Sequence, residues 1–330
     1  MPIQARHIDA AAPGEYDALT MIKRREFLAG GTTALWMMSA TRARAANVKQ
    51  FKLGVITDEI TQDFEKALAW VKGYGLEWVE LRNVWNKYIT EFTPDEVKRA
   101  KDLLAKYNLR VSVLDSAYFK TTLPGTTSKF AEGKGDFAAN EHEKQDALLE
   151  RAFARAGDFG TDKVRIFSFW RVDDPHTVFD RVAKELDKTA EIAKHEGIRL
   201  VLENESACNV ATGAEGAAML NAVKAPSLGL NWDPGNAYAA GERKPYPDGY
   251  DLLDKKRLWH MHLKDAEGEG EVWRPIGGGR IDYVGQFRAI LKDGFSGTMS
   301  LETHYLNAAE DKESSSRESM DGLLKVIRAV

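Results

Sequence analysis

Eight strand-like runs alternate with helix-like segments from Phe51 onward, and this alternation limits the chain to few folds. Strictly alternating β and α elements imply a parallel sheet, and eight such units imply that the sheet closes into a barrel. We therefore predict an α/β protein that forms a single-domain (β/α)8 barrel. The strand-like runs are KLGVITDEI, EWVELRNVW, LRVSVLDSAY, KVRIFSFWR, IRLVLENES, SLGLNWDPGN, LWHMHLKD and TMSLETHY.

The segments between these runs carry start and stop signals of helices. Thr93 is a favourable capping residue, and Pro94 follows it at the first helical position. Gly160, Gly197 and Gly294 stand where helices are expected to end. The alternative fold is a doubly wound open sheet, but no strand-like run leads into the Gly-x-Gly-x-x-Gly turn that cradles phosphate in such folds. The predicted helices span residues 64–74, 94–107, 143–159, 177–195, 213–223 and 283–292.

Residues 1–46 are predicted to be an N-terminal extension with an export signal, and residues 47–330 to be the barrel. The sequence KRREFL at positions 23–28 precedes a modestly apolar run, residues 30–40, and Ala43-Arg44-Ala45 then offers a small-residue cleavage site. This pattern resembles a twin-arginine signal. We therefore expect cleavage after Ala45, the twin-arginine export machinery as a partner, and a periplasmic or otherwise exported protein.

Two alternatives for this segment are a basic amphipathic N-terminus and a membrane anchor. The apolar run is too short and too rich in Gly and Thr to span a bilayer, which disfavours the anchor. Met21 would give the signal a normal length, so translation is expected to start at either Met1 or Met21.

Charge and cysteine content limit the partners of the chain. The formal net charge is −4 with acids and bases interspersed, which argues against a nucleic-acid partner because such proteins carry a basic stripe. Cys208 is the only cysteine, so the core rather than an internal disulfide has to hold the fold in an oxidising periplasm. The longest irregular stretch, residues 120–141, follows the third strand-like run and is predicted to be a lid or a wall of the substrate site.

Four consecutive strand-like runs each end in a side chain that can bind a metal. Glu203, Asp233, His262 and Glu302 follow apolar residues, so each is expected at the carboxyl end of a buried strand, where barrel enzymes keep their chemistry. A single glutamate at a strand end is ordinarily a capping or salt-bridged group, but four such residues in succession indicate one site. One imidazole and three carboxylates suit a single divalent cation. They favour Mn²⁺, Mg²⁺ or Co²⁺ over a thiolate-bound structural zinc, with Zn²⁺ and Fe²⁺ as alternatives.

This residue set suits proton transfer next to a carbonyl. Moving a carbonyl along a sugar, or inverting the carbon beside it, requires removal of the α proton and stabilisation of the resulting enediolate. A cation supplies the charge stabilisation, and two carboxylates on opposite sides of the substrate serve as base and acid.

The combination LENES, NWDPGN, HMHLKD, GGGRIDY and LETHY resembles the xylose-isomerase-like TIM barrel superfamily, in particular its sugar phosphate isomerase/epimerase group. The resemblance covers nearly all of the chain after the signal. It implies that Glu203, Asp233, His262 and Glu302 bind one divalent metal, and that Glu203 and Glu302 also move the substrate proton. Many relatives have His three positions after the Asp, where this chain has Asn236, so the substrate contact expected there differs.

Other residues are candidates for substrate contacts. His260 shares the strand face of His262 one layer deeper, and either supports the site or packs in the core. Lys264 could reach a substrate oxygen or pair with Glu302. Arg280, after three glycines, could bind an anionic group or be a solvated loop residue. His304 is an outer-sphere candidate or a surface residue.

An aromatic wall against a sugar ring, with core packing as the alternative, would comprise Arg82, Trp85, Tyr118, Trp170 and Arg171.

The function predicted from these residues is a divalent-metal-dependent isomerase or epimerase that acts on a free or oxidised sugar or a cyclitol. The alternative is a metal-dependent lyase or dehydratase acting on a keto-sugar or 3-keto-glycoside, because the same enediolate can expel a leaving group. An AP-endonuclease-like enzyme would need more histidines for its trinuclear zinc site, and the intact acid/base pair argues against a non-catalytic sugar-binding protein. A small-molecule carbohydrate is the expected partner, and homo-oligomerisation stays open.

Overall fold

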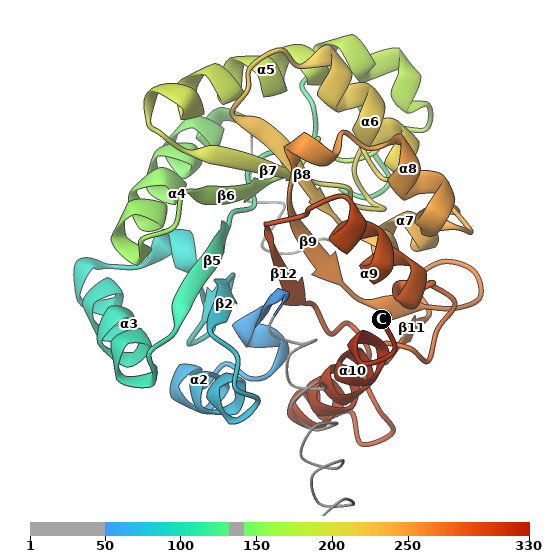
Figure 1. The fold of residues 1–330 in the computed structure, drawn as a ribbon. Helices are drawn as coiled ribbons and strands as arrows, with labels where there is room; N and C mark the ends of the chain where they lie inside the picture. The colour runs from blue at the N-terminus through green and yellow to red at the C-terminus, as the bar shows by residue number, and fades with distance from the viewer. Residues whose placement is uncertain (1–49, 132–141) are drawn as a thin grey trace, which may run out of the picture. The chain divides into compact units, whose positions relative to one another are not determined.

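A computed structural model describes residues 50–131 and 142–330, and in them eight parallel strands form one sheet. The order around the sheet is β1-β12-β9-β8-β7-β6-β5-β2, and every neighbouring pair is parallel. A parallel bridge between Ile56 and Glu80 links the two ends of this order, so the sheet is nearly closed into a barrel (Figure 1). The strands are β1 Lys52–Val55, β2 Trp78–Leu81, β5 Arg110–Asp115, β6 Lys163–Ile166, β7 Arg199–Glu203, β8 Leu228–Trp232, β9 Leu258–Leu263 and β12 Thr298–Leu301.

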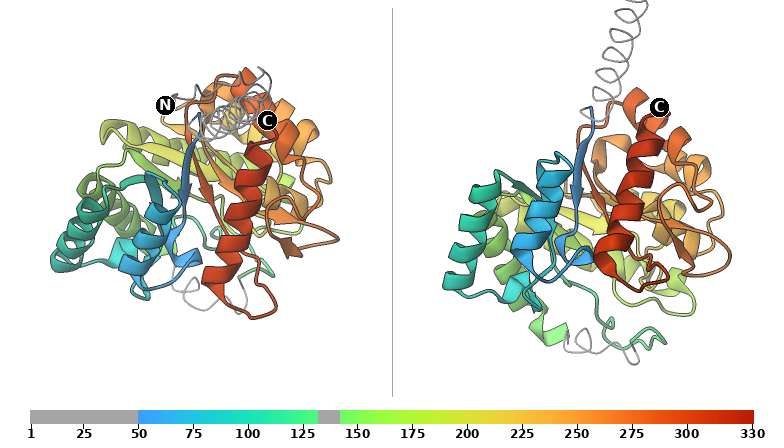
Figure 2. Two further views of the ribbon diagram at one scale, coloured as in Figure 1. Left: turned by 60° about the horizontal axis from the view of Figure 1, so that its bottom comes forward. Right: turned by 90° about the horizontal axis from the view of Figure 1, so that it is seen from below.

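The helices lie outside the ring of strands, as expected for a (β/α)8 barrel (Figure 1). The last of them, α10, lies beside the first strand in both views of Figure 2, and Ser316 Oγ donates a hydrogen bond to Glu59 O just after that strand. Two small antiparallel hairpins, β3–β4 and β10–β11, extend from the loops. The helices are α2 Phe64–Gly73, α3 Pro94–Tyr107, α4 Gln145–Phe159, α5 Phe179–His195, α6 Gly213–Ala222, α7 Pro234–Ala239, α8 Tyr250–Leu252, α9 Tyr283–Lys292 and α10 Lys312–Ile327. The hairpin strands are β3 Asn83–Val84, β4 Lys87–Tyr88, β10 Asp265–Ala266 and β11 Trp273–Arg274.

Local sequence explains where these helices begin and end. Thr93 caps α3 and forms a reciprocal capping box with Glu96, with Pro94 at the first position. Gly160 ends α4 in the left-handed conformation, at φ 71°, which glycine adopts without steric cost. The six helices predicted from the sequence all form, and their ends lie within two residues of the predicted ones. The sequence analysis did not single out α10.

The interior of the barrel is unusually polar. Apolar side chains such as Leu68, Leu81 and Phe287 are fully buried in the core. In contrast to the branched apolar residues that commonly fill such barrels, several charged or polar side chains on the strands are also buried. They are Glu80, Arg165, Asn231, His260 and Ser300. Burying such groups is unfavourable unless they are paired; Glu80 pairs with His260, and Arg165 pairs with Glu203.

The predicted export signal and residues 132–141 of the predicted lid lie outside the described residues. Within residues 50–131 and 142–330, no helix is long and apolar enough to cross a membrane.

Candidate metal centre

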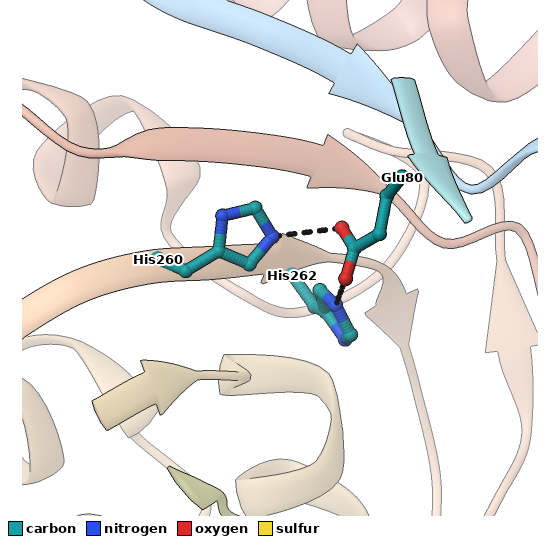
Figure 3. Close-up of side chains that lie close together, drawn as sticks. All are labelled: Glu80, His260 and His262. Carbon is teal, nitrogen blue, oxygen red and sulfur yellow. Dashed lines mark hydrogen bonds and ion pairs between the residues drawn. The ribbon is translucent and has the colours of Figure 1, made fainter. Parts of the chain in front are cut away.

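The site rests on two histidines of β9 that face the barrel interior. His260 and His262 are two residues apart on one strand, so their side chains share a face. Figure 3 shows Glu80 of β2 between them. Glu80 Oε2 lies 2.8 Å from His260 Nε2, and Glu80 Oε1 lies 2.9 Å from His262 Nε2. His260 is therefore fully buried and contacts the carboxylate that also contacts His262.

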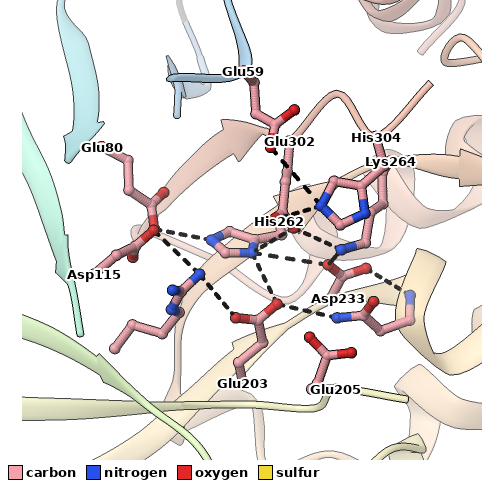
Figure 4. Close-up of polar contacts among 12 residues, drawn as sticks. Glu59, Glu80, Asp115, Glu203, Glu205, Asp233, His262, Lys264, Glu302 and His304 are labelled. Carbon is pink, nitrogen blue, oxygen red and sulfur yellow. Dashed lines mark hydrogen bonds and ion pairs between the residues drawn. The ribbon is translucent and has the colours of Figure 1, made fainter. Parts of the chain in front are cut away.

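Glu203, Asp233, His262 and Glu302 converge at the carboxyl end of the barrel, and Figure 4 shows their side chains pointing toward one another. One ligand atom from each lies within 4.8 Å of the other three. His262 Nδ1 is 3.2 Å from Glu203 Oε1, 3.2 Å from Glu302 Oε2 and 3.8 Å from Asp233 Oδ2. All four side chains are buried. The strand-end pattern therefore predicted the convergence of these four residues.

The donor set fits a divalent cation. Three carboxylates lie close to one imidazole nitrogen in a buried space. A positive ion there would reduce the repulsion between their negative charges. Among the described residues, Glu203 Oε2 and Asp233 Oδ2 are buried oxygens that accept no hydrogen bond of good geometry, although Arg165 and Lys264 lie close to them. Oxygen and imidazole ligands without thiolate suit Mg²⁺, Mn²⁺ or Co²⁺ and are also compatible with Zn²⁺.

Lys264 reaches into the same space. Its Nζ lies 2.6 Å from Glu302 Oε2 and 2.9 Å from Asp233 Oδ2. Burial alone would lower the pKa of Lys264, but the charges of Asp233 and Glu302 raise it above its usual range and keep the ammonium form. Gly235 makes room for this side chain, because a Cβ at that position would lie 2.4 Å from Lys264 Cγ. Of the two roles expected for Lys264, the structure shows the pairing with Glu302.

The other oxygen of Glu302 has nitrogen neighbours of its own. Arg82 Nη1 lies 2.9 Å and His304 Nε2 3.3 Å from Glu302 Oε1. Burial opposes ionisation of Glu302, but Lys264, His304 and His262 outweigh it and hold its pKa well below the usual range. The sequence analysis placed Arg82 in an aromatic wall, whereas in the structure it is an ion-pair partner of Glu302. His304 also lies at the site, where it is partly exposed.

Glu203 is held from two sides. Arg165 Nη1 lies 3.2 Å from Glu203 Oε2, and Asn236 Nδ2 donates to Glu203 Oε1 at 3.1 Å. Burial would raise the pKa of Glu203, but His262 and Arg165 lower it, so the carboxylate form is favoured. Burial raises the pKa of Asp233 to about 6. The predicted site residue Asn236 therefore lies in the cluster and contacts one of its carboxylates.

Three of the predicted substrate-binding residues have contacts with other parts of the protein. Tyr118 places its hydroxyl 3.0 Å from Thr189 Oγ1 of α5, so it packs between the sheet and a helix. Trp170 belongs to a buried apolar cluster with Phe167 and Cys208. Arg280 is exposed on the loop after β11, and its backbone N–H donates to Ala266 O. Tyr118 and Trp170 therefore pack in the core and Arg280 is exposed, while their contacts with a substrate stay predictions.

The rest of the predicted aromatic wall also has other partners. Trp85 stacks on Phe92 with ring centroids 5.6 Å apart. Arg171 Nη2 pairs with Glu215 Oε1 at 2.7 Å. Sequence reasoning missed Glu80 and Arg165. The one available signal was a charged residue within an apolar strand-like run, which is rarely buried unless it is paired.

Comparisons with known proteins support this architecture. One curated relative, an uncharacterized protein of Methanocaldococcus jannaschii, is 26% identical over 140 residues, which are 41% of this chain and 47% of that protein. The match thus spans about half the length of that relative. Among solved structures, the IOLI protein with a bound zinc atom aligns with a TM-score of 0.66 and 17% identity, over 84% of this chain and 98% of that one.

Two further structures with the same fold are enzymes by name. D-psicose 3-epimerase with D-tagatose, from Clostridium cellulolyticum H10, aligns with a TM-score of 0.58 and 14% identity, over 84% of this chain and 96% of that one. The probable 3-DHS dehydratase AsbF from Bacillus anthracis aligns with a TM-score of 0.60 and 17% identity, over 81% of this chain and 98% of that one. At these identities the likeness shows the fold alone.

The family assignment rests on a longer match. The family model described as xylose isomerase-like TIM barrel matches residues 68–326, which include seven of the eight barrel strands, β1 being the exception. This confirms the family resemblance predicted from the strand-end motifs. The chain belongs to the xylose isomerase-like TIM barrel family.

Proposed function

We propose that this protein is a divalent-metal-dependent isomerase or epimerase that moves a proton at the carbon beside a carbonyl of a free or oxidised sugar or a cyclitol. The observation that carries this proposal is the buried convergence of Glu203, Asp233, His262 and Glu302 on one point. The epimerase among the structures of the same fold supports the reaction class.

Glu203, Asp233, His262 and Glu302 are the residues that would hold the cation. When bound, the cation supplies positive charge that stabilises negative charge developing on the substrate oxygens. The oxygen-rich set favours Mn²⁺, Mg²⁺ or Co²⁺, and the zinc-bearing structure with the same fold keeps Zn²⁺ among the candidates, with Fe²⁺ as a further alternative.

Glu203 and Glu302 are suited to move the proton. They lie on β7 and just after β12, on either side of the strands that carry Asp233 and His262. Both carboxyl groups have lowered pKa values, so each is in the carboxylate form at neutral pH, the form that a base requires. In epimerisation, one carboxylate would remove the proton from one face of the substrate carbon. The second carboxylate would then deliver a proton to the opposite face. Isomerisation needs only one carboxylate to carry the proton between neighbouring carbons.

The surrounding residues orient the substrate and keep water out. Arg82 and Lys264 direct N–H groups at Glu302, where substrate oxygens could also accept them. Asn236 donates to Glu203 Oε1, and Arg165 lies 3.2 Å from Oε2, so both oxygens of this carboxylate are oriented. Burial of the four residues strengthens each of these electrostatic contacts.

A lyase or dehydratase is the second candidate, and the pair of proton donors beside Glu302 favours it. Lys264 and His304 both lie within 3.3 Å of Glu302 oxygens, so either could protonate a leaving group on the neighbouring carbon. The dehydratase among the structures of the same fold supports this alternative.

The test is to incubate the metal-loaded protein in D₂O with a panel of sugars, keto-sugars, cyclitols and 3-keto-glycosides. Deuterium should enter the carbon beside the carbonyl of one substrate class, and the product separates isomerisation or epimerisation from elimination. Glu203→Gln serves as the control and should show no exchange. Deuterium incorporation at the same rate in Glu203→Gln would contradict the proposed role of this carboxylate.

We also propose that the protein is exported by the twin-arginine route. The sequence KRREFL at 23–28, the short apolar run and Ala43-Arg44-Ala45 support this proposal, as does the single cysteine, which needs no oxidative pairing. Replacing Arg24 and Arg25 by Lys should hold the full-length protein in the cytoplasm. Equal export of the double variant in a fractionation experiment would rule out this route.

A further inference from the structure

Glu80 is a fully buried carboxyl group that the proposed proton transfer does not use. It lies on β2 in the barrel interior, between the two histidines of β9 (Figure 3). Its Oε1 is 2.9 Å from His262 Nε2, and its Oε2 is 2.8 Å from His260 Nε2. Each carboxyl oxygen therefore faces a different imidazole, and this arrangement determines where the ring hydrogens lie.

An ionised carboxylate accepts hydrogen bonds and donates none, so both facing Nε2 atoms have to carry a hydrogen. In His260 the other ring nitrogen, Nδ1, lies 2.7 Å from Thr298 Oγ1, and this hydroxyl can donate to it. In His262 the other ring nitrogen is the Nδ1 that faces Glu203 and Glu302. A neutral imidazole with its hydrogen on Nε2 presents its lone pair at Nδ1.

We propose that Glu80 is the positioning residue of the metal centre. It accepts the Nε2–H of His262 and so holds this ring with the Nδ1 lone pair directed at the cation. His260, itself fixed by Thr298, binds the second oxygen and keeps the carboxyl group of Glu80 from rotating. The inference rests on the proposed metal-dependent function, because it assigns a role toward the cation of that site.

A second cation bound by Glu80, His260 and His262 is the competing interpretation, since one ligand atom of each lies within 4.8 Å of the others. Hydrogen bonds already link both Nε2 atoms to Glu80, so a cation would have to replace both contacts. It would also have only three ligands in a space with no exposed side chain. A positioning role of Glu80 needs no such rearrangement. The number of metal ions bound per chain distinguishes the positioning role from the second cation site.

The experiment compares zinc binding by the wild type, Glu80→Met and Glu80→Gln in equilibrium dialysis with a competing chelator. Met has a similar length and accepts no strong hydrogen bond. Gln keeps one strong acceptor, so its effect should be smaller. Residues that orient a metal-binding histidine typically contribute about 10–100-fold to metal affinity, which is the loss expected for Glu80→Met. Glu215→Gln, a partly buried glutamate paired with Arg171, is the matched control and should bind zinc as the wild type does.

Nitrogen-15 NMR of the zinc-loaded wild type with labelled histidine gives an independent measurement that needs no variant. We expect one zinc per chain, with the hydrogen of His262 on Nε2 and zinc on Nδ1. Unchanged zinc affinity in both Glu80 variants, zinc bound at Nε2, or two zinc ions per chain would each overturn the inference while leaving the proposed function standing. A wild type that binds no zinc, magnesium or manganese would instead overturn the proposed function.

Discussion

At the residue scale, Glu203 and Glu302 have the same strand-end position but different neighbours. Glu302 shares its two oxygens among Lys264, Arg82 and His304, whereas Glu203 has Asn236 on one oxygen and Arg165 3.2 Å from the other. The two carboxylates are therefore equivalent in the sequence pattern and distinct in the site. Substitution can measure what each contributes.

Glu203→Gln and Glu302→Gln should each lower turnover by about 10²–10⁴-fold, the usual effect of removing a general base, with circular dichroism unchanged. Glutamine keeps the size and one oxygen but does not accept the proton. His262→Ala should act mainly through metal affinity, so excess metal should partly restore its activity but not that of the Gln variants. Near-normal turnover of Glu302→Gln would show that this carboxylate is only structural.

Lys264 places its ammonium on the same Asp233 and Glu302 oxygens that face His262 Nδ1. A cation bound there would be repelled by this charge, so Lys264→Met should bind metal more tightly than the wild type. The metal-free variant should be less stable, because two buried carboxylates lose their partner. Isothermal titration and thermal unfolding measure the two effects. Weaker metal binding would contradict the expected repulsion.

Lys163→Met is the matched control for this substitution. Lys163 begins β6 at the amino end of the barrel and pairs with Asp162 at 3.0 Å. It lies at the opposite end of the strands from the metal centre, so its removal should leave metal affinity unchanged.

The four candidate ligands could be predicted because each follows its own apolar run, so only local sequence was needed. Glu80 could not be found this way, since its partner His260 is 180 residues away in the chain. Likewise, Arg82 reaches Glu302 across 220 residues. Pairings between distant strands depend on which side chains meet inside the closed barrel, and no local pattern records that.

At the scale of elements, helix boundaries were predictable for the same reason. The capping box of α3 and the glycine after α4 are read from three or four neighbouring residues. The aromatic wall was predicted from strand ends, but position alone does not tell which way a side chain turns. Tyr118 contacts α5 and Trp170 belongs to an apolar cluster, and neither contact could be read from the strand-end position.

The start of α6 combines a helix cap with an ion pair, and it makes stability depend on pH. Glu215 accepts hydrogen bonds from the backbone N–H groups of Ala211 at 2.8 Å and Thr212 at 3.1 Å, and it pairs with Arg171. Burial would raise the pKa of Glu215, but these partners outweigh it and lower the pKa. A carboxyl group whose pKa is lower in the folded state stabilises the fold above its unfolded pKa, about 4.3.

This contribution should be complete at pH 7 and should fade as the pH falls below about 4. Glu215→Gln should therefore lower the free energy of unfolding by about 1–2 kcal/mol at pH 7, and the difference from the wild type should shrink in acid. Urea unfolding at pH 7, 4 and 3 measures this. A difference that is constant over that range would show that the carboxylate charge does not contribute.

At the scale of the whole molecule, barrel closure could be predicted from eight alternating units, because few other arrangements pair eight parallel strands. Closure of the barrel also brings the residues of the candidate metal centre together. Its candidate ligands come from β7, the residue after β8, β9 and the residue after β12, and they span residues 203–302. In the unfolded chain these four side chains are far apart, so a cation that needs all of them binds only the folded protein.

Metal binding should therefore raise the stability of the entire barrel. At a free metal concentration 100 times the dissociation constant, linkage predicts about 2.7 kcal/mol of added stability. For a chain of this size that corresponds to a rise in Tm of roughly 5 °C, which a chelator should reverse. Asp233→Asn and His262→Ala should lose most of the shift at the same metal concentration, whereas Glu215→Gln should keep it although its own Tm is lower. A full shift in Asp233→Asn would place the stabilising ion elsewhere in the protein, and the link between barrel closure and metal binding would then fail.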